Sequence, residues 1–343
     1  MIMKKISKPT TEEITKKFED LVTQNNYENI INFIKELIEK EVPSCEIFLY
    51  LDKYYYSPSE DNPSFKQALI MLRDDGTLHK LFNMDNSSVA IEIVAAYIDR
   101  SDNLDLNDKK LTELPSYVCY LHKLKTLNLT WNQLTSLPES ISHLKQLEKL
   151  DLYHNDIAVF PESICLLPQL SELNLNNNQL TQLYKDIGQL QQLQKLYLQN
   201  NQLISLPESI CHLRQLIILD LGYNQLSILP ESIDQLQQLI VLNLNENQLT
   251  TLPDNIGQLH SLQIMDLDGN KIPTLPDNIV KLQPLPRSNY KPASAQLINI
   301  EIPTAHDIKS LDIEQIPKKH YEQTRKYNFP KIKSAPSKLE ITI

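Results

Sequence analysis

Asparagine recurs at a constant interval of 23 residues through the middle of this chain, and each copy lies in the same frame of leucines. The frame reads LxxLxLxxNxLxxLPxxIxxLxx, which the segments 193–215 and 216–238 follow closely. A period of this length, kept without insertions, is typical of a solenoid in which each unit packs only against its neighbours. The repeated asparagines are Asn132, Asn155, Asn178, Asn201, Asn224, Asn247 and Asn270.

This frame resembles that of the leucine-rich repeat family, and eight units of it, from 101–123 to 262–284, cover roughly half of the chain. The resemblance implies an α/β solenoid with a parallel β-sheet on its concave side and short 3₁₀ or irregular segments on its convex side. It also implies that binding takes place on the concave surface. The first unit departs from the frame, since Lys109 stands where asparagine belongs. That departure suits a terminal unit that meets something other than another repeat.

The LxLxx segment of each unit is expected to be a short strand, because apolar and polar residues alternate along it. Leu219 and Leu221, for example, should point inward, and Asp220 between them should point outward. The repeated asparagine then lies at the turn out of the strand, where its amide can pair with buried backbone groups. An unpaired group of this kind costs about 1–3 kcal/mol, so we interpret these asparagines as structural.

The outward strand positions supply the candidate binding residues. Trp131 is the only tryptophan of the chain and is predicted to be exposed beside Tyr153 and His154. Exposed aromatic residues often anchor interfaces, although single ones are also common on surfaces that bind nothing. A second column of three residues is apolar where earlier units carry polar side chains, and either the C-terminal tail or a partner is expected to cover it. The candidate partner-binding residues are Trp131, Tyr153, His154, Tyr197, Tyr223, Ile218, Val241 and Ile264.

Residues 1–100 are predicted to be an α-helical domain. Thr10 and Glu13 have the spacing of a capping box, and apolar residues recur on one helical face before Pro43. We interpret this domain as a cap on the open end of the repeats, with a second binding module as the alternative. Four to five helices are expected. The capping box and the apolar face over residues 27–38 account for the part before Pro43, and further helices are expected at about 45–56, 64–73 and 87–99.

After the repeats of 101–284, the segment 285–343 is interpreted as a C-terminal cap and a flexible tail. Residues 296–302 alternate polar and apolar side chains, which favours one last strand at the sheet edge. Residues 303–343 are rich in Pro, Lys and Ser with weak periodicity, and we expect them to be extended or disordered.

The charge balance argues against nucleic acid as a partner. Residues 101–284 contain 20 Asp and Glu against 11 Lys and Arg. This acidic excess repels a phosphate backbone, so a basic or dipolar protein is the expected partner.

Catalytic chemistry has no recognisable motif in this sequence. The five glycines form neither GxxxxGK nor GxGxxG, and the histidines and cysteines show neither HExxH nor CxxC spacing. We therefore expect no catalytic residue, no cofactor and no metal. Some bacterial leucine-rich repeat proteins are ubiquitin ligases with a catalytic cysteine after the repeats, but residues 285–343 contain no cysteine. Cys45 lacks an assignable base and is interpreted as a small buried residue.

No segment near residue 1 resembles a signal peptide, and no apolar run reaches the roughly 18 residues that a membrane span needs. Cys119, Cys165 and Cys211 occupy one equivalent position in alternate units. They should therefore lie about 10 Å apart, too far for disulfides. We expect a cytoplasmic protein, or one delivered into a host cytoplasm by a route other than Sec.

These observations predict a monomeric, non-enzymatic module that binds a protein on the concave face of its repeats. The repeats resemble those of intracellular scaffolds that bind small GTPases and signalling proteins, and also those of effectors that bacterial pathogens deliver into host cells. The Asn-, Gln-, Ile- and Lys-rich composition favours the effector. The alternative is an enzyme or regulator whose activity lies in residues 1–100, with the repeats as its substrate-recognition arm.

Overall fold

The structure is a computed structural model that describes residues 9–24, 27–40, 42, 47, 69–72, 74 and 88–281. The chain divides into two compact units, Met1–Ile300 and Glu301–Ile343, and every described residue belongs to the first. Cys45, most of the helix expected at 45–56, the strand expected at 296–302 and the tail at 303–343 lie outside the described residues.

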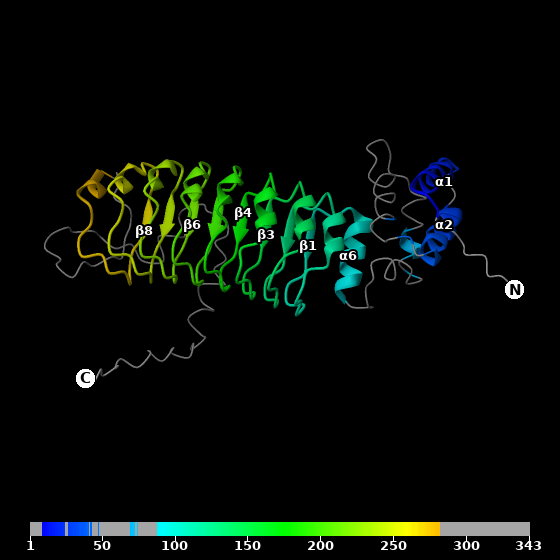
Figure 1. Cartoon of the computed structure of the whole chain (residues 1–343), viewed down its shortest axis with the longest axis horizontal. Helices are drawn as coiled ribbons and strands as arrows, with labels where there is room; N and C mark the ends of the chain where they lie inside the picture. Colours follow the sequence, from blue (N-terminus) through cyan, green and yellow to red (C-terminus); the bar gives the residue numbers. More distant parts are fainter. Residues whose placement is uncertain are drawn as a thin grey trace, which may run out of the picture. The chain divides into compact units, whose positions relative to one another are not determined.

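Each repeat contributes one three-residue strand to a single parallel sheet, and the strands follow one another in chain order (Figure 1). The offset between paired residues is one repeat, so that Leu196 pairs with Leu219. This confirms the predicted α/β solenoid. The strands are β1 (Asn103–Asp105), β2 (Thr126–Asn128), β3 (Lys149–Asp151), β4 (Glu172–Asn174), β5 (Lys195–Tyr197), β6 (Ile218–Asp220), β7 (Val241–Asn243) and β8 (Ile264–Asp266).

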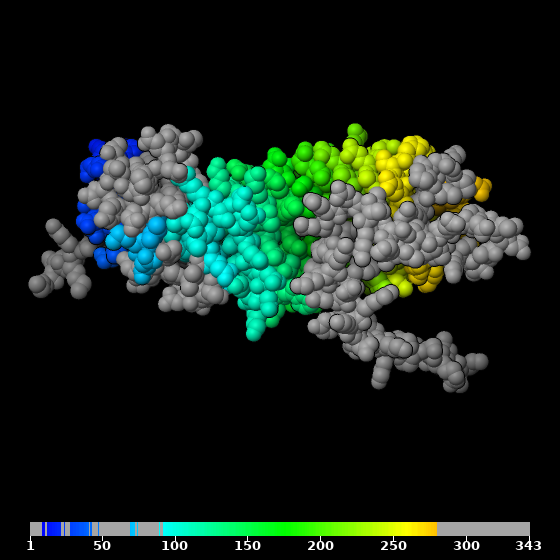
Figure 2. All heavy atoms as spheres, turned by 180° about the vertical axis from the view of Figure 1, so that it is seen from behind, coloured from blue at the N-terminus to red at the C-terminus, as the bar shows by residue number. Residues whose placement is uncertain are grey.

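The second half of each repeat forms a short 3₁₀ turn, as the 23-residue period predicts. Proline precedes several of these turns in an extended conformation, for example Pro138 and Pro207. In the space-filling view, the coils follow one another across the surface in sequence order, from cyan through green to yellow (Figure 2). The turns are η1 (Ser116–Tyr120), η2 (Glu139–His143), η3 (Glu162–Leu166), η4 (Ile187–Gln189), η5 (Glu208–His212), η6 (Ile233–Gln235), η7 (Ile256–Gln258) and η8 (Asp277–Lys281).

The leucines of the frame form one continuous core between the sheet and the 3₁₀ turns. Leu219 and Leu221 are fully buried, as are Leu226 and Ile233 from the second half of the same unit. Burial of a leucine side chain contributes about 1.5–3 kcal/mol, so the column of leucines is the main source of stability. Each coil contributes to it, and the two open ends of the column need cover.

The repeated asparagines pair with backbone groups of two adjacent coils. Nδ2 of Asn201 donates to the carbonyl oxygens of Leu175 at 2.9 Å and Leu198 at 3.0 Å. Its Oδ1 accepts from the backbone N–H of Leu180 at 3.0 Å. The same pattern recurs at Asn224. The structural interpretation of these asparagines is therefore confirmed.

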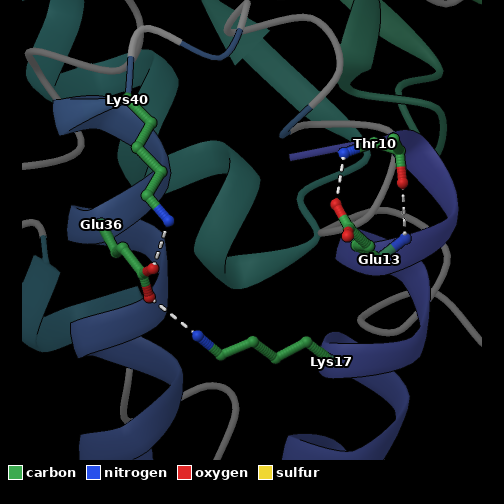
Figure 3. A network of polar contacts seen from close by, with 5 residues as sticks. All are labelled: Thr10, Glu13, Lys17, Glu36 and Lys40. Carbon is green, nitrogen blue, oxygen red and sulfur yellow. Dashed lines mark hydrogen bonds and ion pairs between the residues drawn. The ribbon is translucent and has the colours of Figure 1, made fainter. Parts of the chain in front are cut away.

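The described N-terminal helices are α1 (Thr11–Thr23), α2 (Tyr27–Glu39) and α6 (Ser88–Asp99). The capping box is present: the backbone N–H of Thr10 donates to Glu13 Oε2 at 2.8 Å, and that of Glu13 donates to Thr10 Oγ1 at 3.3 Å (Figure 3).

Glu36 of α2 links the first two helices. Its carboxylate accepts from Lys17 Nζ of α1 at 2.8 Å and from Lys40 Nζ at 2.6 Å (Figure 3). These hydrogen bonds hold the pKa of Glu36 below its ordinary value. Lys17 Nζ also lies 4.2 Å from the centre of the Phe33 ring. Such contacts add a modest cation–π attraction to the packing of α1 on α2.

Helix α6 packs against β1, at the first unit of the array. Lys109, the residue that replaces the repeated asparagine there, forms an ion pair with Glu92 of α6 at 2.5 Å. In an ordinary unit, the repeated asparagine at the turn out of the strand bonds the preceding coil. The first unit has no preceding repeat, so a long cationic side chain that reaches a helix replaces it.

Candidate functional site

The residue before each of the seven repeated asparagines has a left-handed backbone, and so does the residue before Lys109 at the equivalent position of the first unit. We call these eight residues the left-handed row. At each of them the chain turns sharply out of its strand. In every coil but the last, the backbone N–H of this residue bonds the next coil, as from His154 to the Asn176 carbonyl at 3.0 Å. The row consists of Asp108 (φ 54°), Trp131 (56°), His154 (56°), Asn177 (56°), Asn200 (56°), Tyr223 (54°), Glu246 (51°) and Gly269 (74°).

Sequence reasoning missed this row as a conformational feature. Glycine and asparagine adopt left-handed backbone more readily than other residues. Three residues of these two types, Asn177, Asn200 and Gly269, stand one position before a repeated asparagine. They were the sequence signal for a left-handed backbone at this position.

The predicted aromatic group does come together, at the ends of β2 and β3. The Trp131 ring centre lies 3.9 Å from that of His154, with 38° between the ring planes. It lies 5.6 Å from that of Tyr153 in an edge-to-face arrangement of 70°. Trp131 is half-buried and His154 is exposed. Partial burial of the imidazole lowers the pKa of His154, against the opposing effect of Asp156.

The prediction that Tyr153 stands in the open was wrong, because only 4% of its surface is exposed. The Trp131 ring lies against it, and its hydroxyl accepts from Asn177 Nδ2 at 3.1 Å. Burial raises the pKa of the Tyr153 hydroxyl. Tyr153 therefore supports the cluster from beneath and is not itself a free contact.

The other two tyrosines lie apart from this cluster, on later coils. Tyr197 on β5 is half-buried, and burial, followed by the negative charges of Glu172 and Asp220, raises its pKa. Tyr223 belongs to the left-handed row and is 49% exposed. Of the two, Tyr223 is the one available for contact.

The apolar column runs straight across β6, β7 and β8, with Ile218 paired to Val241 and Val241 to Ile264. Val241 and Ile264 are half-buried, but Ile218 is only 4% exposed. Ile218 therefore has less free surface than the other two residues of the column.

The same register carries charges on the preceding strands. Glu172 forms ion pairs with Lys149 at 3.8 Å and with Lys195 at 3.4 Å. The first outward residue of each strand is thus charged on β3, β4 and β5 and aliphatic on β6, β7 and β8. A partner that crosses these strands meets two different chemistries.

The middle outward column contains acids that the sequence interpretation did not single out. Asp220 Oδ1 accepts from the Gly222 N–H at 3.3 Å and from Asn243 Nδ2 at 2.8 Å. Burial raises the pKa of Asp220 to about 6, and it has the same effect on Asp151. The regular alternation of aspartate with asparagine in this column was the available signal. Its members are Asp105, Asn128, Asp151, Asn174, Tyr197, Asp220, Asn243 and Asp266.

Gly222 is the next outward residue of its coil, two positions after Asp220. A Cβ atom there would overlap the side-chain oxygen of Asn245 on the next coil. A larger residue at position 222 would therefore have to displace the Asn245 side chain.

Cys119, Cys165 and Cys211 are unbonded and buried. Burial raises the pKa of Cys119 to about 11 and those of Cys165 and Cys211 to about 12. These thiols are protonated at neutral pH and are poor nucleophiles. Within the described part of the chain, no three His, Cys, Asp or Glu side chains are grouped as metal ligands would be. None of the described helices has the length and apolar character needed to cross a bilayer.

Comparisons with known proteins agree with this architecture. A model of the leucine rich repeat matches residues 102–157, 168–226, 191–247 and 226–272. A model of two repeat copies matches residues 145–187. No curated protein matches the sequence.

Two solved structures are similar to the chain. One is a leucine-rich repeat protein of Leptospira interrogans, 36% identical over 57% of this chain and 56% of that chain, with a TM-score of 0.49. The other is the leucine-rich repeat ectodomain of the plant membrane receptor kinase GASSHO1/SCHENGEN3 from Arabidopsis thaliana, solved in complex with CASPARIAN STRIP INTEGRITY FACTOR 2. It is 31% identical over 57% of this chain and 24% of that chain, with a TM-score of 0.52. This chain thus spans about half of the first structure and a quarter of the second.

The family models match from residue 102 to residue 272, and throughout this range each unit forms one strand of the sheet and one 3₁₀ turn. The chain belongs to the leucine-rich repeat family.

Proposed function

We propose that this protein is a non-enzymatic protein-interaction module, and that Trp131 and His154 anchor its partner at the strand ends of the first repeats. The observation that carries the proposal is the backbone conformation of these two residues. Both have φ of 56°, as do Asn177 and Asn200 at the equivalent positions. The turn itself therefore needs no aromatic side chain.

A large side chain at such a φ costs roughly 1–2 kcal/mol relative to glycine. Trp131 and His154 thus sit where the fold favours glycine or asparagine, and they reduce stability there. Departures of this kind from the local rule are expected at functional positions. Half-buried tryptophan is also among the commonest energetic anchors of protein interfaces.

The plant receptor ectodomain adds support of a general kind. It was solved in complex with CASPARIAN STRIP INTEGRITY FACTOR 2, and its repeats have the same fold as those of this chain. An array of this type is suited to hold a partner across several coils. Tyr197, Tyr223, Val241 and Ile264 lie on later coils and belong, in this proposal, to the outer part of the same contact area. Tyr153 and Ile218 support it from below.

The domain division 1–100, 101–284 and 285–343 is part of the proposal. The ion pair between Lys109 and Glu92 and the packing of α6 on β1 support a capping role for the N-terminal helices.

The test replaces both anchors with the residue that the same row already uses, in the double variant Trp131→Asn with His154→Asn. Tagged wild-type and variant chains are used to capture proteins from a eukaryotic lysate, and the affinity of the captured protein is then measured. We expect the variant to bind at least about a hundredfold more weakly, because each anchor contributes about 2 kcal/mol or more.

The variant should melt at the same temperature as the wild type or slightly higher, because left-handed strain is relieved. Asn200→Ala, in the same row but away from the aromatic cluster, is the matched control and should bind normally. Equal affinity of the double variant and the wild type would move the binding site off this cluster.

In its finer form, the proposal is that the protein is a bacterial effector that acts on a signalling protein, such as a small GTPase, in a host cytoplasm. The Asn-, Gln-, Ile- and Lys-rich composition supports this form. A translocation reporter fused to the full chain, expressed in a bacterium that infects eukaryotic cells, should give signal in the host cytoplasm. Signal confined to the bacteria would argue against delivery.

A further inference from the structure

We infer that the Trp131 ring and the Asp108 carboxylate together form a binding site for a cationic side chain, arginine or lysine, of the partner. The inference rests on the proposed function, because it concerns the same surface, and it adds the chemistry that the surface recognises. Both residues belong to the left-handed row and follow each other in it.

The geometry of the row places the two residues next to each other. Equivalent residues of adjacent coils are about 4.8 Å apart in a parallel sheet. The backbone N–H of Asp108 donates to the Thr130 carbonyl at 3.0 Å, directly before Trp131, which ties the two positions together. The His154 ring covers the Trp131 ring from the side of β3. The inferred cation lies on the opposite face of the indole, on the side of the first unit, where Asp108 is exposed.

A carboxylate and an indole face are mutually unfavourable neighbours unless a cation lies between them. The face of an aromatic ring carries negative electrostatic potential and repels an anion, whereas a cation is attracted by the ring and by the carboxylate at once. Asp105, on the strand that leads to Asp108, is also exposed and adds to the negative field. The pair is thus complementary to one positive side chain.

The lysines near this site are mostly engaged elsewhere. Lys109 is held by Glu92 of α6, and Lys125 is held by Glu148 at 3.0 Å. Lys110 is exposed, but it belongs to the segment that leaves the sheet after the turn. The charge of Asp108 therefore remains available to a partner.

A second exposed aromatic residue of the row does not repeat this arrangement. Tyr223 is 49% exposed, but the carboxylate of Glu246, the next member of the row, lies against Gly269 of the last coil. Between Trp131 and Tyr223, Asn200 Nδ2 donates to Asn177 Oδ1 at 3.0 Å. The inferred cation site is therefore confined to Trp131 and Asp108.

Trp131 is the only tryptophan of the chain, so its fluorescence reports on this site alone. We compare quenching by caesium and by iodide ions, each relative to its quenching of N-acetyltryptophanamide. On this scale caesium should quench more strongly than iodide, because the acids attract the cation and repel the anion. Asp108→Asn should lower the ratio of the two relative quenching constants about twofold. Asp254→Asn, which removes the same charge from an exposed site on a distant coil, should leave the ratio unchanged. Equal relative quenching by the two ions, or equal ratios for the two variants, would overturn the inference.

Binding is tested with fluorescein-labelled hexa-arginine and hexa-glutamate, by anisotropy, on the full chain at low salt. We expect hexa-arginine to bind the wild type and hexa-glutamate not to bind. Hexa-arginine should bind Trp131→Leu and Asp108→Asn at least about threefold more weakly than it binds the wild type. Trp131→Phe should retain most of the affinity. Asp254→Asn should bind as the wild type does, and circular dichroism melts check that every variant is folded. Equal affinity of the wild type, Trp131→Leu and Asp108→Asn would refute the cation site.

This outcome is distinguishable from failure of the proposed function. In one outcome, the Trp131→Asn and His154→Asn double variant no longer captures the protein, but substitutions at Trp131 and Asp108 do not change hexa-arginine binding. The proposed interface then stands, and only the inferred cation site is wrong. If hexa-arginine binding depends on both residues while protein capture does not, the cation site remains and the proposed anchor role fails.

Discussion

At the scale of single residues, two adjacent positions in every coil have opposite roles. The repeated asparagine is buried and bonds backbone groups of two coils, whereas the residue before it is left-handed and carries a side chain that the turn does not need. Asn201 and Asn200 are one such pair. The same residue type is thus structural at one position and replaceable at the next.

Asn201→Ala should lower the free energy of unfolding by about 1–3 kcal/mol, because it leaves the Leu175 carbonyl and the Leu180 N–H without their partner. Asn200→Gly loses only the exposed bond to Asn177, and glycine accepts the left-handed backbone of this position. It should therefore change stability by less than about 0.5 kcal/mol. Urea denaturation of the two variants measures the difference. Equal losses of stability would contradict the assignment of roles.

At the scale of elements, the sheet aligns equivalent side chains into columns, and each column has a chemistry that no single strand has. The middle column places Asp220 of β6 beside Asn243 of β7, where the carboxylate is partly buried and its pKa is raised to about 6. The ordinary value for an aspartate is near 4. Between about pH 4 and pH 6, the folded chain therefore holds this proton more tightly than the unfolded chain does.

The sign of the resulting pH dependence follows directly. A raised carboxyl pKa makes the unfolding free energy fall as pH rises through this window, and the loss persists above it. Asp220→Asn removes the loss while keeping an oxygen that accepts from Gly222. We expect it to stabilise the chain by about 1–2 kcal/mol at pH 7 and by almost nothing at pH 4. Urea denaturation at the two pH values is the measurement, with Asp254→Asn as control. A gain that is equal at both values would show that burial of the charge is not the cause.

At the scale of the whole molecule, the repeats need cover at the end of their apolar column. We propose that helix α6 supplies it, since Ile93, Val94 and Tyr97 are fully buried and the helix packs on β1. The ion pair of Glu92 with Lys109 lies at the edge of this contact. The helix and the atypical first unit are therefore parts of one arrangement.

A chain that begins at residue 101 should be poorly soluble and self-associating, because it exposes the leucines of the first unit. Size-exclusion chromatography with light scattering measures this. Glu92→Gln in the full chain is the matched control. It breaks only the partly exposed ion pair and should cost less than about 1 kcal/mol. A monomeric 101–343 chain with a cooperative melt would contradict the capping role.

Sequence alone determined the repeat period, the one-repeat register of the sheet, the inward leucines and the structural asparagines. These features are local and periodic: a residue at a given place in the frame meets the same neighbours in every coil, so its role can be read from its position. The capping box at Thr10 and the helix at residues 88–99 were predictable for the same reason, since their signals lie within one turn of helix.

Only the tertiary structure decided which outward side chains are free. Tyr153 and Ile218 occupy outward positions of the frame, yet both are buried. Adjacent coils are only about 4.8 Å apart, so a large side chain on one coil can cover its neighbour on the next. The exposure of an outward side chain depends on which side chains occupy the adjacent coils. The raised pKa of Asp220 and the stacking of His154 on Trp131 depend on them as well. Those combinations differ from coil to coil, and the repeating frame carries no information about them.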